Sequence, residues 1–144
     1  MASPRIAIGV AALGLYACGG DPLSADQYRE QGNRICREAE REAREIEDSG
    51  LRAQIEESVA AAERSQERFE QLDPPEELRE AHDKAVRQGR EALDLLRQAK
   101  ESVEEGGDSG ASLLELGPEL DRVLREGAET SRELGLHDCV PGAP

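Results

Sequence analysis

The chain has 144 residues, enough for one domain and not two. Asp and Glu number 32 against 18 Lys and Arg, which gives a formal net charge of −14, and Trp is absent. This composition argues against a nucleic-acid partner, which requires a basic surface, and equally against electrostatic docking on anionic lipid.

The first predicted element is an uncharged, mostly apolar segment that follows Arg5. Residues 6–17 contain no charged side chain. As a helix this segment would span about 18 Å, too short for a hydrocarbon core of roughly 30 Å. The length is typical of the hydrophobic part of a signal peptide, so the sequence predicts a signal peptide over residues 1–17.

The end of this segment, Leu15-Tyr16-Ala17-Cys18, resembles the lipobox of bacterial lipoproteins. Leu15, Ala17 and Cys18 match that motif, whereas Tyr16 replaces its usual small residue. The resemblance implies cleavage before Cys18 and acylation of its thiol. Residues 18–23 would then be the lipidated cysteine and a short tether, and the acyl chains would hold the protein on the extracytoplasmic face of the cell membrane. The alternatives are an ordinary secretory signal cut near Ala17, and a buried apolar strand or helix.

Two cysteines, Cys36 and Cys139, remain once Cys18 is acylated. On the oxidising side of a membrane two such thiols usually form a disulfide. Because the closed loop is 103 residues long, the chain-entropy model gives a stabilisation of about 4 to 5 kcal/mol. Only 23 residues after Cys18 are Leu, Ile, Val or Phe, a content at which disorder is also conceivable. The disulfide therefore favours a folded domain.

The first helix is predicted to begin at Ser24. Ser24 and Gln27 have the spacing of a capping box, and Leu23 and Tyr28 have that of a hydrophobic staple. Residues 48–50 are predicted to end this helix, with Gly50 as a left-handed cap. Its apolar positions recur with the helical period: Ile35, Ala39, Ala43 and Ile46.

Three further helices are expected. The second ends at residues 73–76, where Asp73 can cap the next helix. It carries a stripe of Leu51, Ile55, Val59, Ala62, Phe69 and Leu72. The third covers about 74–105, and its heptad seam is Leu78, His82, Ala85, Gly89, Ala92, Leu96, Ala99 and Val103.

A glycine-rich loop over 106–110 separates the third helix from the fourth, which is expected over about 111–134. Gly117-Pro118 predicts a kink or an interrupted first turn, and Gly135 ends the helix. The inward positions are expected to be Leu113, Leu116, Leu120, Val123, Leu124 and Leu134.

Short connections between consecutive helices predict an all-α fold, an antiparallel up-down four-helix bundle over residues 24–140 with a tail at 141–144. The predicted disulfide joins Cys36, twelve residues into the first helix, to Cys139 near the end of the chain. Two arrangements allow this: the first turns of the first helix protrude as a stalk, or the C-terminal segment folds back along the bundle.

Three short sequence segments, in this order along the chain, resemble those of a group of small, disulfide-linked helical lipoproteins from GC-rich bacteria. They are the segments 33–36 (Asn-Arg-Ile-Cys), 72–75 (Leu-Asp-Pro-Pro) and 135–139 (Gly-Leu-His-Asp-Cys). The use of 16 Arg against 2 Lys agrees with a GC-rich origin. No activity is assigned to that group, so the resemblance implies an architecture and not a mechanism.

Few side chains are candidates for chemistry. His82 is either a histidine that only packs in the helix seam or a ligand-binding group. Glu104, Glu105 and Asp108 surround the glycine-rich loop and either hold a divalent cation or are simply solvated. No cofactor is indicated, and no serine lies in a nucleophile motif.

These observations predict a non-catalytic, membrane-anchored extracytoplasmic lipoprotein whose bundle serves interaction or spacing in the cell envelope. Its protein partner would be an unknown envelope protein. The alternative is an extracytoplasmic module that binds a small ligand or cation within the helical bundle, with His82 and the acidic loop as its contacts.

Overall fold

The computed structural model describes residues 21–46, 50–105 and 109–140. Four long helices follow one another, α1 (Ala25–Ile46), α2 (Leu51–Glu70), α3 (Arg79–Glu104) and α4 (Ser109–Leu134). Two short 3-10 helices accompany them, η1 (Glu76–Leu78) and η2 (His137–Cys139). The described residues contain no strand, so the expected all-α class is confirmed. The predicted signal peptide and the tail at 141–144 lie outside the described residues.

Helix α1 begins at the predicted capping box. The Ser24 N–H donates to Gln27 Oε1 at 3.0 Å, and the Gln27 N–H donates to Ser24 Oγ at 3.2 Å. These two bonds satisfy backbone donors that have no partner inside the helix. Leu23 and the fully buried Tyr28 both belong to the hydrophobic core at this end of the molecule, as the predicted staple requires.

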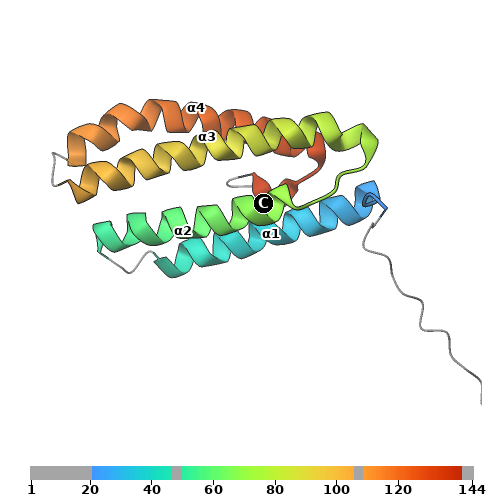
Figure 1. Ribbon diagram of the computed structural model, residues 1–144, viewed down its shortest axis with the longest axis horizontal. Helices are drawn as coiled ribbons and strands as arrows, with labels where there is room; N and C mark the ends of the chain where they lie inside the picture. Colours follow the sequence, from blue (N-terminus) through green and yellow to red (C-terminus); the bar gives the residue numbers. More distant parts are fainter. Residues whose placement is uncertain (1–20, 47–49, 106–108, 141–144) are drawn as a thin grey trace, which may run out of the picture.

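Each long helix packs against the next one in the chain (Figure 1). The principal core cluster lies where α1 begins, α2 ends, α3 begins and α4 ends. It consists of the side chains of Tyr28, Ile35, Leu72, Leu78, Leu134 and Leu136. Burial of each of these side chains contributes about 1.5 to 3 kcal/mol to the stability of the fold.

The C-terminal segment folds back into the molecule. In Figure 1 η2 lies between the α1–α2 pair and the α3–α4 pair. Among the described residues, α1 packs extensively against α2 and η2 but not along α4. Of the two arrangements that the sequence allowed for the disulfide, the structure therefore has the folded-back C-terminal segment.

Two expectations about helix ends are wrong. Gly50 is not a left-handed cap: its φ is −64°, and it is the extended N-cap residue of α2, where a β-region conformation is needed. Asp73 does not cap the third helix, because Pro75 is the N-cap of η1 and α3 begins only at Arg79. Helix α4 continues through Pro118 instead of being interrupted there.

Two positions expected to point inward are exposed. Leu124 on α4 is 50% exposed, and Ala43 near the end of α1 is also exposed. Both positions agree with the lack of extensive α1–α4 packing among the described residues, because a helix face with little packed opposite it stays open to solvent.

Candidate functional site

His82 is a core residue of α3. It is 5% exposed, and its Nδ1 lies 3.0 Å from Tyr28 Oη. Its ring stacks on Phe69 with centroids 5.1 Å apart. Burial lowers the pKa of His82, because desolvation disfavours the imidazolium, and it raises the pKa of Tyr28. The two side chains thus form a neutral hydrogen-bonded pair inside the core.

The predicted disulfide is confirmed, with Cys36 on α1 joined to Cys139 in η2 across a Cα–Cα distance of 5.1 Å. Gly135 turns the chain back with a φ of +77°. Leu136 N–H then donates to Ser131 C=O at 2.8 Å and Gly135 N–H donates to Arg132 C=O at 3.1 Å. This pattern is a Schellman motif, for which glycine is favoured because its φ is positive.

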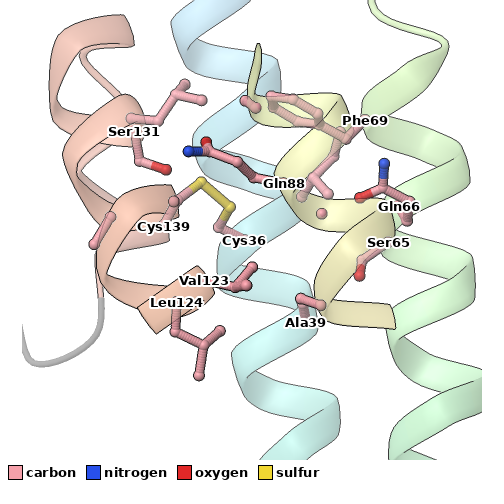
Figure 2. A pocket seen from close by; sticks show the side chains of 17 residues that line it. Cys36, Ala39, Ser65, Gln66, Phe69, Gln88, Val123, Leu124, Ser131 and Cys139 are labelled. Carbon is pink, nitrogen blue, oxygen red and sulfur yellow. A yellow bond between two sulfur atoms is a disulfide. The ribbon is translucent and has the colours of Figure 1, made fainter. Parts of the chain in front are cut away.

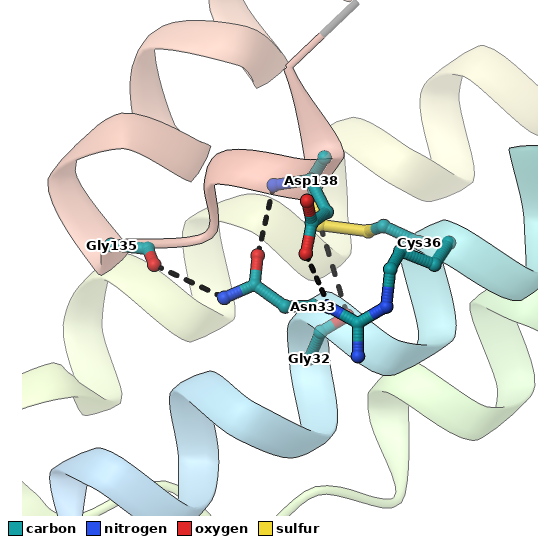
Figure 3. Close-up of a disulfide and its surroundings, with 7 residues drawn as sticks. Gly32, Asn33, Cys36, Gly135 and Asp138 are labelled. Atoms are coloured by element: carbon teal, nitrogen blue, oxygen red, sulfur yellow. Dashed lines mark hydrogen bonds and ion pairs between the residues drawn. A yellow bond between two sulfur atoms is a disulfide. The ribbon is translucent and has the colours of Figure 1, made fainter. Parts of the chain in front are cut away.

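Residues 135–139 turn back against α1, and we call them the returning segment. Asn33 holds this segment on α1 (Figure 3). Its Nδ2 donates to Gly135 C=O at 3.4 Å, and its Oδ1 accepts the Asp138 N–H at 2.9 Å. Arg37 pairs with the Asp138 carboxylate. The segments 33–36 and 135–139, which the sequence analysis singled out, are therefore in direct contact.

An open apolar pocket of 230 Å³ lies beside the disulfide (Figure 2). We call it the Gln88 pocket; its walls come from α1, α2, α3, α4 and η2. Phe69, Val123 and Leu136 supply larger apolar side chains, and none of the lining side chains is ionisable, since the two cysteines are bridged. The space exists because many of the lining residues are small: Ala39, Ala85, Gly89, Ala92, Gly127 and Ala128.

Gln88 is the unusual polar side chain of this pocket. It is 9% exposed, and its Oε1 is buried without a hydrogen-bond partner. In Figure 2 its amide extends from α3 toward Ser131 and the disulfide. Sequence reasoning did not select this residue, although Gln88 follows Ala85 by three positions and precedes Ala92 by four, which places it on the same helix face.

The structure does not bring the sequence-predicted site residues together. His82 contributes nothing to the lining of the Gln88 pocket. Glu104 pairs with Lys100 at 3.7 Å and Glu105 is exposed, while Asp108 lies outside the described residues. Within the described part of the chain, no three acidic, histidine or cysteine side chains are grouped to hold a metal ion.

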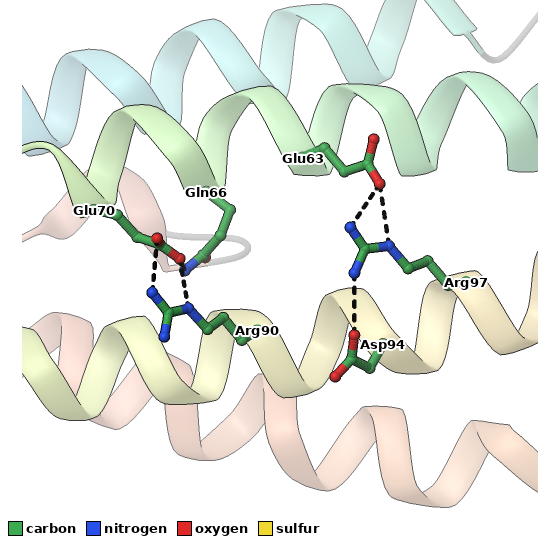
Figure 4. A network of polar contacts seen from close by, with 6 residues as sticks. All are labelled: Glu63, Gln66, Glu70, Arg90, Asp94 and Arg97. Carbon is green, nitrogen blue, oxygen red and sulfur yellow. Dashed lines mark hydrogen bonds and ion pairs between the residues drawn. The ribbon is translucent and has the colours of Figure 1, made fainter.

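Charged side chains tie α2 to α3 on the solvent side (Figure 4). Arg90 donates two hydrogen bonds of 2.8 Å to the Glu70 carboxylate, and Arg97 donates to Glu63 at 2.8 and 3.1 Å. The hydrogen bonds from Arg90 and then from Gln66 lower the pKa of Glu70 to about 2. Ion pairs of Glu and Arg thus join neighbouring helices as well as residues of one helix.

The predicted lipidation site, Cys18, lies outside the described residues. Within the described ranges, no helix has the length and apolar character needed to cross a bilayer. Comparison with known protein families finds no matching family model, and comparisons with curated proteins and with solved structures find no match.

Proposed function

We propose that this chain is a lipid-anchored extracytoplasmic protein of the cell envelope, with a non-catalytic helical domain that serves interaction or spacing. The observation that carries the proposal is the Cys36–Cys139 disulfide. A helical domain that is closed by a disulfide suits an oxidising compartment, where such bonds persist. The signal peptide with the lipobox-like segment ending in Cys18 would direct export of the chain to such a compartment.

The arrangement of the domain suits a spacer. We propose that the four helices form an antiparallel up-down bundle, because the core cluster combines the starts of α1 and α3 with the ends of α2 and α4. Helices α3 and α4 have 26 residues each, and a helix of that length spans about 39 Å. Ion pairs between neighbouring helices, such as Arg90–Glu70 and Arg122–Glu91, would help to keep such a rod straight.

The negative charge of the domain also fits this role. Repulsion between the net charge of −14 and anionic head groups would hold the domain away from the bilayer. The acyl chains on Cys18 would then provide the attachment, since no basic cluster follows Cys18 in the sequence.

The test is the Cys18→Ser variant, expressed in a bacterium that processes lipoproteins. We expect the parent chain in the membrane fraction, with an acylated N-terminal peptide beginning at Cys18 by mass spectrometry. Cys18→Ser should accumulate as a precursor or in the soluble fraction, because the acceptor thiol is lost.

The matched control is the Cys36→Ser/Cys139→Ser double variant, which loses two thiols but keeps Cys18 and should stay in the membrane fraction. A Cys18→Ser protein that remains tightly membrane-bound at its processed size would contradict the proposal.

A further inference from the structure

We propose that the Gln88 pocket is a binding site for a neutral, mostly apolar small molecule of one or two rings that donates one hydrogen bond to Gln88 Oε1. The proposal does not depend on the lipid anchor. It rests on the geometry of α3, α4 and the returning η2 segment.

The unpartnered amide is the first reason. Gln88 Oε1 is buried without a hydrogen bond in a side chain that is 91% buried. Leaving a buried acceptor unsatisfied costs stability, and native proteins therefore satisfy nearly all such groups. Gln88 lines an open pocket, and a rotation of its terminal amide, without movement of any helix, would present Oε1 to a bound donor (Figure 2).

The size of the pocket limits the ligand. Its volume is 230 Å³. An apolar cavity of about 150 Å³ in another protein accepts one benzene molecule. The Gln88 pocket therefore suits a single ring or two fused rings, and it is too small for a nucleotide or for most drug-sized ligands, which need roughly 300 Å³ or more.

The charge of the surroundings selects a neutral ligand. No lining side chain can carry a compensating charge, so an ion would lose its hydration without gaining a partner. The net charge of −14 adds long-range repulsion against anions. Aromatic and aliphatic contacts with Phe69, Val123 and Leu136 would supply most of the affinity.

Two glycines show which wall is filled and which is open. A Cβ on Gly89 would overlap Gln66 Oε1, and Gln66 is held in place by donating to Val86 C=O and to Glu70. A Cβ on Gly127 would meet no atom within 4 Å. The α2–α3 wall is therefore closely packed, whereas the α4 side has room for a ligand.

The test uses two probes of nearly equal shape with the full chain in solution. Indole carries one N–H donor, and benzothiophene has none. We expect both to bind, because both rings fit the apolar space, with indole binding about tenfold more tightly through its hydrogen bond to Gln88. Dissociation constants are measured by titration followed by NMR.

Three variants locate the site. Gln88→Leu should abolish the preference for indole while benzothiophene still binds. Gly127→Leu should weaken both probes at least tenfold by filling the pocket. Glu129→Leu, which places the same side chain at an exposed position two residues further along α4, should leave both dissociation constants unchanged. Circular dichroism melts of each variant report whether it is folded.

Several results would overturn the proposal. Equal binding of the two probes by the parent chain would show that Gln88 accepts no hydrogen bond from a ligand. Binding that persists in folded Gly127→Leu would place the probes elsewhere. Absence of binding by either probe at millimolar concentration would mean that the pocket holds only water or, if the chain sediments as a dimer, a second copy.

Discussion

The hydrogen bond between Tyr28 and His82 determines how costly a substitution of His82 is. The Tyr28 hydroxyl is fully buried, and His82 Nδ1 is its partner at 3.0 Å. As a seam residue that contributes only packing, His82 would be replaceable by leucine at little cost. The hydrogen bond reverses that expectation, because removing the imidazole would strand a buried hydroxyl.

We therefore predict that Tyr28→Phe and His82→Leu each lower the free energy of unfolding by about 1 to 3 kcal/mol. The loss of unfolding free energy in the double variant should be about 1 kcal/mol smaller than the summed losses of the two single variants. The reason is that replacing both polar partners leaves no unpaired group. Urea denaturation of the four proteins in the cycle measures this coupling. Strict additivity would show that the hydrogen bond contributes nothing to stability.

At the scale of elements, the returning segment depends on the close approach of α1 and Leu136. Leu136 is 1% exposed, and one of its methyl carbons, Cδ2, lies 2.6 Å from the position of a Cβ on Gly32. Only glycine leaves enough room there. The same contact positions η2, and hence Cys139, against the fourth turn of α1.

We predict that Gly32→Ala destabilises the domain by about 1 to 3 kcal/mol, because the added methyl group displaces a buried side chain. The matched control is Gly127→Ala, also inside a helix, where the new methyl group meets open space. The free energy of unfolding of that variant should rise by about 0.5 to 1 kcal/mol, because alanine has a higher helix propensity than glycine. Thermal melts compare the two; stabilisation by Gly32→Ala would contradict the proposed packing.

At the scale of the whole molecule, the disulfide joins the first helix to the end of the described chain. It closes a loop of 103 residues, and η2 separates α1 from α4 where those helices do not pack directly. Asn33 and Arg37 add polar contacts between the same two segments. Loss of the disulfide should therefore loosen the returning segment first and the Gln88 pocket with it, because Cys36, Leu136 and Cys139 line that pocket.

Reduction of the purified chain should lower its melting temperature by roughly 10 °C or more, since a loop of this length contributes about 4 to 5 kcal/mol. The Cys36→Ser/Cys139→Ser double variant should melt at the lower temperature with or without reductant. Mass mapping without reduction should recover the linked peptide pair. Free thiols at both positions in protein isolated from the organism that makes it would contradict this prediction.

The sequence by itself determined the features that depend on local patterns. The capping box at Ser24, the end of the last long helix at Gly135 and the all-helical class follow from residue types and spacings within one segment. The disulfide partners were predicted because the three cysteines leave only Cys36 and Cys139 if Cys18 is the predicted lipidation site.

Only the tertiary structure decided what each helix face meets. Periodicity placed Leu124 on an apolar face, but it could not show that this side chain stays half exposed. It likewise gave no reason to choose Gln88 over His82, since both lie inward on α3. The Tyr28 hydroxyl satisfies His82, whereas nothing in the described chain satisfies Gln88 Oε1. Whether an inward polar group has a partner depends on the side chains that other helices bring opposite it, and a one-dimensional pattern does not contain that information.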